Sequence, residues 1–251
     1  FKILNQIAIK KNLRISNINK TFKKIKNIDL KFEEDFKIRN LAMAIEAAKL
    51  CGLKEKLIYK GLNKLKDVNG RLELVKKYPN GVKVFIDYAH TPDALSKTLK
   101  SLKNNYGNNI SLVFGCGGER DRTKRPIMAK IANDNCKKIY ITDDNPRNEK
   151  PKKIRQELSK NILKNKSFNI GNRTLAIKKA ILNAYPQEVV LIAGKGHEEQ
   201  QIYKNKILNI SDKKIVKKIN IKKKNITKKK QNYRQNSSIL NQILGKKKSL
   251  N

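Results

Sequence analysis

Four short segments of this chain concentrate the residue types that bind ligands and move protons. They are D-Y-A-H-T-P at Asp87–Pro92, G-C-G-G-E-R-D-R-T-K-R-P at Gly115–Pro126, D-D-N-P-R at Asp143–Arg147 and G-K-G-H-E at Gly194–Glu198. Both histidines of the chain, His90 and His197, fall within them. A single histidine is more often structural than functional, but two of two in such segments make the two roles about equally favoured.

The arginines of these segments carry a stronger signal. Of 59 Lys and Arg residues only ten are Arg, and four of the ten lie here: Arg120, Arg122, Arg125 and Arg147. A solvated surface would draw lysine in this lysine-rich chain, whereas guanidinium forks suit carboxylates and phosphates. Asp144 and Glu198 add carboxylates that can hold an ammonium or a metal ion, and the glycines allow close approach of the backbone. Together these residues predict a zwitterionic or multiply charged ligand, with phosphate nearby.

Each segment directly follows a predicted strand. The four strands are expected at Val82–Asp87, Ile110–Gly115, Lys138–Thr142 and Glu188–Ala193, and helices at Pro92–Leu102, Lys124–Asn133, Pro151–Leu163 and Arg173–Ala184. Short apolar strands alternating with helices predict an α/β fold with a mostly parallel sheet flanked by helices. Because the carboxyl ends of parallel strands line one crevice, the four segments should converge on one site.

The two ends of the chain are patterned differently. Before the strands, helices are expected at Asn40–Cys51 and Lys54–Lys66, and the alternation over Ile28–Phe32 suggests a strand. Beyond Ile219 the pattern dissolves into a Lys/Asn/Gln-rich stretch, and residues 220–251 are expected to form a basic, disordered tail.

Six motifs, in order along the chain, resemble those of the Mur ligases, and within them the MurE-type enzymes that add diaminopimelate. Besides the last three segments named above, they are D-F-K-I-R-N at Asp35–Asn40, G-R-L-E at Gly70–Glu73 and D-Y-A-H-T-P-D-A-L at Asp87–Leu95. The late I-S-D-K-K at Ile210–Lys214 also resembles a family segment. The resemblance runs from about residue 32 to residue 219.

The resemblance implies a domain organisation. Residues 1–69 would be the end of a central ATP-binding domain, and residues 70–219 a Rossmann-like C-terminal domain that binds the amino acid. An N-terminal UDP-binding domain, the phosphate loop and a modified lysine that helps hold Mg²⁺ would be absent from this chain. The chain starts at Phe1 without an initiator methionine, so it is expected to be a fragment, inactive alone, that needs a complementary N-terminal piece.

The resemblance also implies roles for particular residues. Those expected to bind diaminopimelate are Arg120, Asp144, Asn145, Pro146, Arg147, Gly194 and Glu198. Those expected on the nucleotide side are Asn40 at the adenine, Arg71 at the ribose, and Asp87 and His90. No metal ligand and no catalytic residue is assigned in this chain, because the main ligands of ATP and Mg²⁺ would lie in the missing part.

The implied reaction joins meso-diaminopimelate to UDP-MurNAc-L-Ala-D-Glu with ATP, through an acyl phosphate, in peptidoglycan synthesis. The D-N-P-R motif resembles the version that selects diaminopimelate over L-lysine. Arg147 can form a bidentate pair with the second carboxylate of diaminopimelate, which lysine lacks, and Arg120 would bind the same carboxylate. The alternative enzyme is a folylpolyglutamate synthetase-like ligase, against which the D-N-P-R and G-K-G-H-E motifs argue.

The composition supports a second alternative, a basic nucleic-acid-binding protein. The net charge is +38, yet residues 213–251 supply 14 of the basic residues, and the scarcity of Arg favours an AT-rich coding sequence as the cause. Nucleic-acid binding is therefore the less favoured reading. No apolar run approaches the ~18 residues of a membrane span, and no signal peptide is evident, so a cytoplasmic protein is expected. Of the three cysteines, Cys116 is expected to be a small buried residue rather than a nucleophile.

Overall fold

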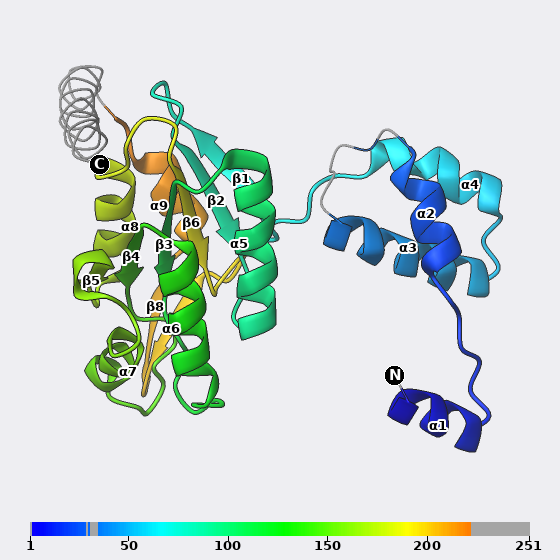
Figure 1. Cartoon of the computed structure of the whole chain (residues 1–251), viewed down its shortest axis with the longest axis horizontal. Helices are drawn as coiled ribbons and strands as arrows, with labels where there is room; N and C mark the ends of the chain where they lie inside the picture. Colours follow the sequence, from blue (N-terminus) through cyan, green and yellow to red (C-terminus); the bar gives the residue numbers. More distant parts are fainter. Residues whose placement is uncertain (1, 29, 31–34, 222–251) are drawn as a thin grey trace, which may run out of the picture. The chain divides into compact units, whose positions relative to one another are not determined.

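The computed structural model describes residues 2–28, 30 and 35–221 (Figure 1). It divides between Lys66 and Asp67 into two units, which are described separately. The division lies close to the domain boundary expected at residue 69. Assigning the first unit to a central ATP-binding domain stays a prediction.

The first unit is helical. Its elements are α1 Lys2–Lys10, α2 Asn19–Lys26, α3 Asp35–Leu50, α4 Glu55–Gly61 and the 3₁₀ turn η1 Leu62–Lys64. Ile25 of α2 packs in a small core with Ile38 and Ile45, which follow the apolar face of α3. The two predicted helices are confirmed, although the second ends earlier, in the 3₁₀ turn.

The strand suggested over Ile28–Phe32 is not formed by its described residues. Ile28 lies in a bend after α2, and Leu30 has no regular structure. Both side chains pack against the helical core instead, which explains their apolar character without strand pairing. Phe32 lies outside the described residues.

The second unit is built on a six-stranded sheet with the order β1-β2-β6-β3-β4-β5. Its strands are β1 Glu73–Lys77, β2 Lys83–Asp87, β3 Ile110–Phe114, β4 Lys138–Ile141, β5 Ser167–Asn169 and β6 Val189–Ala193. Only β1 runs antiparallel, and all other neighbours are parallel. Every residue of β3 and β6 is buried, as expected for central parallel strands covered on both faces. The predicted fold class is confirmed.

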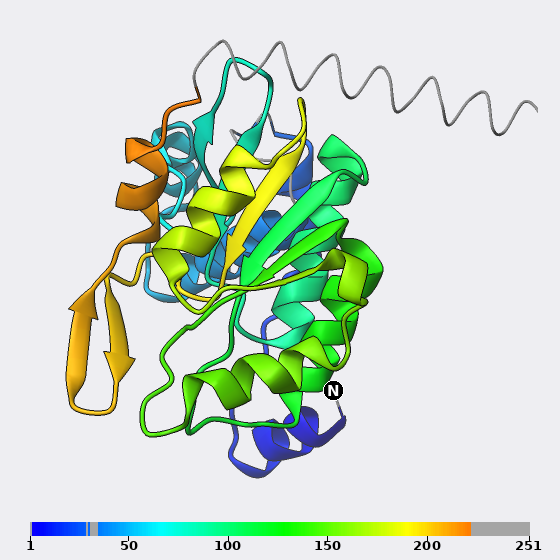
Figure 2. The same cartoon turned by 90° about the vertical axis from the view of Figure 1, so that its left-hand side faces the viewer.

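Helices cover both faces of the sheet (Figures 1 and 2). On one face α5 Pro92–Tyr106, α6 Lys124–Asn135 and α7 Pro151–Ser159 pack in sequence against one another. On the other face, α8 Arg173–Leu182 and α9 Asp212–Lys218 cover a hydrophobic core. Alternate strand residues such as Val84, Val113 and Val190 belong to this core. The predicted helix at Pro151–Leu163 is shorter, because it ends at Ser159.

Several elements were not predicted from the sequence. They are α1, α2, β1, β5, α9 and the hairpin of β7 Gln200–Tyr203 and β8 Lys206–Asn209. Strand β1 is a partly exposed edge strand, and β5 has only three residues, so neither carries a buried apolar run. Of the expected tail, Ile221 packs against the core and Asn220 accepts a hydrogen bond from Lys76, so these two residues belong to the folded unit. Residues 222–251 lie outside the described residues.

The strand order explains how distant loops meet. The chain runs across the sheet from β2 through β3 and β4 to β5, and then returns to place β6 between β2 and β3. The carboxyl ends of β2, β6, β3 and β4 therefore stand side by side, where ligands bind in open α/β sheets.

Candidate functional site

The four segments singled out in the sequence converge on a cleft of ≈ 500 Å³. The expected site residues that line it are His90, Arg120, Asp144, Asn145, Arg147, Gly194 and Glu198. Pro146 belongs to the same loop but does not line the cleft. The prediction from strand alternation that these loops lie together is thus confirmed.

Close packing requires glycine at two positions in the loops that form this cleft. A side chain at Gly118 would place its Cβ 1.9 Å from the Pro146 carbonyl oxygen, so only glycine lets these two loops touch. Gly194 has φ +109°, and a Cβ there would lie 2.8 Å from Asp144 Oδ2. Both positions therefore demand glycine for space, and Gly194 also for its backbone conformation.

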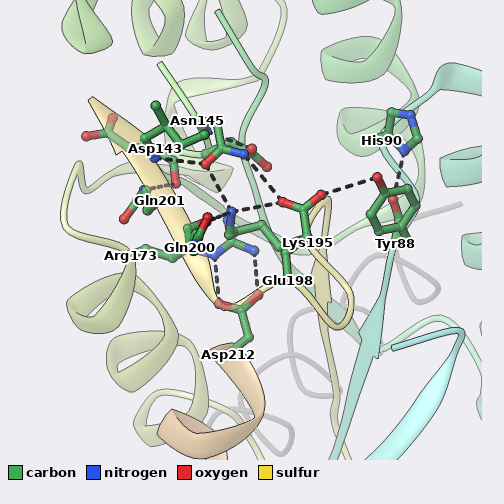
Figure 3. Close-up of polar contacts among 12 residues, drawn as sticks. Tyr88, His90, Asp143, Asn145, Arg173, Lys195, Glu198, Gln200, Gln201 and Asp212 are labelled. Atoms are coloured by element: carbon green, nitrogen blue, oxygen red, sulfur yellow. Dashed lines mark hydrogen bonds and ion pairs between the residues drawn. The ribbon is translucent and has the colours of Figure 1, made fainter. Parts of the chain in front are cut away.

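The acidic end of the cleft is formed by Asp144 and Glu198. Glu198 accepts hydrogen bonds from Tyr88 Oη (3.2 Å) and Lys195 Nζ (3.3 Å), as Figure 3 shows. Burial and the adjacent Glu198 raise the pKa of Tyr88, so its hydroxyl keeps its proton and acts as the donor. Within the described part of the chain, Asp144 has no ion-pair partner and accepts only the Asn145 amide (2.7 Å). Two carboxylates at one end of a cleft suit a ligand ammonium.

The basic side of the cleft is formed by Arg147 and Arg120. Arg147 has φ +51°, and its backbone is held by hydrogen bonds with Ile202 (3.0 Å) and Lys204 (2.8 Å) of the β7–β8 hairpin. Its Nη1 donates to Gly118 O (2.9 Å), which fixes the guanidinium at the cleft wall. Arg120 is exposed, and its one hydrogen bond to the described residues is from Nη1 to the carbonyl oxygen of its neighbour Glu119 (3.4 Å). One arginine is therefore preorganised and the other is free to move toward a ligand.

A buried ion network supports the glycine-rich loop from below. Arg125 is fully buried and donates to Glu149 (2.9 Å), Glu157 (2.7 Å) and Gly117 O (3.2 Å). Glu149 also accepts the Glu119 amide (2.7 Å). The hydrogen bond from Arg125 lowers the pKa of Glu149 to about 2. Arg125 was expected among the cations of the site, but the structure places it beneath the loop.

Three of the four residues expected on the nucleotide side lie next to Tyr88. The Arg71 guanidinium lies 4.3 Å from the ring centroid of Tyr88, and the His90 ring packs edge-on at 4.7 Å. The Asp87 carboxylate is used internally, accepting from the Leu72 amide (3.1 Å), the Tyr88 amide (2.8 Å) and Thr98. Asn40 lies exposed on α3 of the first unit.

Lys195 and the Arg173–Asp212 pair were not predicted (Figure 3). Arg173 and Asp212 form a fully buried bidentate ion pair with distances of 2.8 and 2.7 Å, joining α8 to α9. Arg173 also donates to the Ala193 carbonyl (3.1 Å), at the end of β6 next to the Gly194–Glu198 loop. No local motif marks such a pair, because its members are 39 residues apart.

Other chemistries find no support in the described residues. Burial raises the pKa of the Cys116 thiol to about 12, so this residue is a buried apolar side chain, as expected. Residues 2–28, 30 and 35–221 hold no group of three or more metal-ligating side chains. A helix able to cross a membrane is likewise absent from that part of the chain.

An open, mostly parallel sheet with charged loops at the carboxyl ends of four neighbouring strands defines an α/β ligand-binding domain. Residues 70–196 match the family described as "Mur ligase, glutamate ligase domain". The chain therefore belongs to the Mur ligase family.

The chain is similar to named members of this family. It is 46% identical over 193 residues to the UDP-N-acetylmuramoyl-L-alanyl-D-glutamate--2,6-diaminopimelate ligase of Buchnera aphidicola subsp. Acyrthosiphon pisum, covering 76% of this chain and 38% of that protein. The protein of the same name from Rickettsia bellii is 41% identical over 204 residues, covering 80% and 42%. A solved structure of a ligase of that name superposes with a TM-score of 0.58 at 33% identity, covering 80% of this chain and 40% of that one. The chain thus spans about two fifths of the length of these relatives.

Proposed function

We propose that this chain is the amino-acid-binding part of an ATP-dependent ligase that adds meso-diaminopimelate to UDP-MurNAc-L-Ala-D-Glu in peptidoglycan synthesis. The observation that carries the proposal is the pairing of Arg147 and Arg120 with Asp144 and Glu198 in one cleft. The names of the similar proteins favour this reaction over the folylpolyglutamate synthetase-like alternative.

The cleft fits a ligand with both carboxylate and ammonium groups. Arg147, with one arm bonded to Gly118 O, keeps its other nitrogens for a ligand carboxylate, and Arg120 can close on the same group. Asp144 and Glu198 would hold an ammonium, with Asn145 and Gly194 forming the wall beside them and Pro146 shaping the same loop from behind. By holding the amino acid in one orientation, the domain would contribute positioning of the attacking amine.

ATP would activate the carboxylate of the second substrate, and on this chain only part of its site is proposed. Arg71 and His90 beside Tyr88, and Asn40 and Asp87, remain the proposed nucleotide-side residues. A Mg²⁺ site does not fit the described residues, which lack a cluster of metal-ligating side chains.

Calorimetric titration of the chain with meso-diaminopimelate and with L-lysine tests the proposal. We expect binding of meso-diaminopimelate in clear preference to L-lysine, because lysine lacks the carboxylate that Arg147 would fork. Arg147→Ala should weaken binding of diaminopimelate by roughly 10–100-fold, the effect of losing a charged hydrogen-bonded pair.

Arg14→Ala is the matched control, since Arg14 is exposed in the first unit. This variant should bind like the unmodified chain. Equal binding of L-lysine would contradict the specificity, and no binding of either amino acid would contradict the assignment of the cleft.

A further inference from the structure

Lys195 is the one fully buried lysine among the described residues of a chain that exposes most of its lysines. Its Nζ donates to Asn145 Oδ1 (3.1 Å), Glu198 Oε2 (3.3 Å) and the Gln200 carbonyl oxygen, as Figure 3 shows. Burying an ammonium is costly unless each of its donors is matched, and here three acceptors match its three protons. The acceptors belong to the D-D-N-P-R loop, the G-K-G-H-E loop and strand β7, so one side chain ties three segments together.

The first consequence concerns the amide of Asn145. Its Oδ1 accepts from both Lys195 Nζ and the Ile202 amide, each at 3.1 Å. Because both donors bind this oxygen, rotating the amide by 180° would place its Nδ2 against the nitrogens of Lys195 and Ile202, which are donors too. Asn145 therefore presents its two Nδ2 hydrogens on the other side of the amide, where one is donated to Glu198 Oε2 (3.4 Å) and the second is left for a ligand. The side chain is fixed as a donor.

The second consequence concerns Glu198. Its side chain is 35% exposed, so the carboxylate reaches the cleft, yet Lys195 and Tyr88 hold one oxygen each. Lys195 also supplies one positive charge beside the two carboxylates, Asp144 and Glu198. The acidic end of the cleft then carries one net negative charge, which a single ligand ammonium neutralises.

We propose that Lys195 is a positioning residue that fixes Asn145 as a hydrogen-bond donor and Glu198 as an acceptor on the same ligand. A donor and a carboxylate set side by side match one α-amino-acid centre, with its carboxylate and its ammonium. This inference rests on the proposed amino-acid-binding function and deepens it. Lys195 does not touch the ligand, because its side chain is fully buried.

NMR of the unmodified chain gives a test that needs no ligand. We expect the Lys195 ammonium to show a ¹⁵N–¹H signal with slow proton exchange, unlike the exposed lysines, because its protons are buried and bonded. In Lys195→Met, which keeps an unbranched side chain of nearly the same length without the charge, the Asn145 side-chain amide signals should shift. A fast-exchanging Lys195 ammonium, or unchanged Asn145 signals in the folded variant, would overturn the inference.

Ligand preference separates positioning from simple stabilisation. Meso-diaminopimelate and pimelate, which lacks both amino groups, are titrated into the unmodified chain, Lys195→Met and the control Lys138→Met. Lys138 forms an ion pair of the same length, 3.3 Å, with buried Glu188 at the other end of the sheet. We expect Lys195→Met to lower the affinity ratio of diaminopimelate to pimelate by at least about 10-fold, and Lys138→Met to leave it unchanged.

An unchanged ratio in Lys195→Met would overturn the positioning role. If the unmodified chain fails to bind diaminopimelate, the proposed function fails, and the NMR signals alone decide the role of Lys195. If Lys195→Met does not fold, the exchange rate of the Lys195 ammonium in the unmodified chain decides it.

Discussion

At the scale of the residue, the cations around the cleft have distinct tasks set by burial. Arg147 lines the cleft wall, whereas Arg125 and Arg173 are fully buried and bind carboxylates of this chain. A guanidinium is suited to such sites because its planar fork bonds two acceptors at once. Lys195 is buried instead among three separate acceptors, which a compact ammonium can satisfy. The arginines singled out from the sequence are therefore of two kinds, those that line the cleft and those that support its loops.

Gly194 allows a prediction at this scale. Gly194→Ala should destabilise the chain by roughly 1–3 kcal/mol through backbone strain at φ +109°. It should also abolish binding of diaminopimelate, because the new Cβ would lie 2.8 Å from Asp144 Oδ2 and displace that carboxylate. Chemical denaturation and calorimetric titration measure the two effects.

Gly107→Ala is the matched control for this substitution. Gly107 has φ +81°, and a Cβ there would meet nothing within 4 Å. It should show a similar loss of stability with unchanged binding. Binding by Gly194→Ala as tight as by the control would refute the close approach.

At the scale of the element, secondary structures far apart in the sequence hold the ligand loops. Helix α6 carries Arg125, which ties the glycine-rich loop to Glu149 before α7 and to Glu157 within it. The β7–β8 hairpin holds the backbone of Arg147, and Tyr203 of the hairpin donates to Asp143 (2.9 Å). The loops are thus supported by neighbouring elements rather than by their own sequence.

The low pKa of Glu149 predicts an acid dependence of stability. Its folded-state pKa of about 2 lies below the ordinary value of 4.5, so its contribution is complete above about pH 4.5 and is lost as the pH falls toward 2. Glu149→Gln should therefore lower the free energy of unfolding at pH 7 by roughly 2–3 kcal/mol. Urea titrations between pH 7 and pH 3 should show this difference shrinking below about pH 4.5. A difference that stays constant with pH would contradict the assignment.

Among the strands, those with a continuous apolar run are predictable from the sequence. The apolar runs of β2, β3, β4 and β6 are buried and were predicted within a few residues. The edge strands and the hairpin were not predicted from the sequence, because they are short and partly exposed. Their hydrophobic pattern is weak because only one face, or neither, is buried.

At the scale of the whole molecule, the net charge does not describe the cleft. The net charge is +38, yet the residues that line or support the cleft include Asp143, Asp144, Glu149, Glu157 and Glu198 beside its arginines. Residues 213–251, beyond the cleft segments, supply 14 of the +38. Charge alone is therefore a weak guide to the ligand of this protein.

A prediction at this scale is that the chain alone does not hydrolyse ATP. The sequence has no G-x-x-x-x-G-K-S/T loop to cradle phosphates, and the described residues lack a metal cluster. A coupled assay for ADP with both substrates should give the background rate, with a full-length diaminopimelate ligase as positive control. ADP formation by the purified chain above that background would refute the prediction.

The sequence by itself determined the α/β class, the four central strands and the convergence of four loops on one cleft. These follow from local periodicity and from the geometry of parallel sheets, which need no knowledge of distant contacts. Only the tertiary structure decided which side chains line the cleft. In the structure Lys195 and Arg125 are buried beneath the loops, and the Asp87 carboxylate accepts hydrogen bonds from other parts of the protein. The sequence does not reveal these contacts, because ion pairs and hydrogen bonds of this kind join residues far apart in the chain.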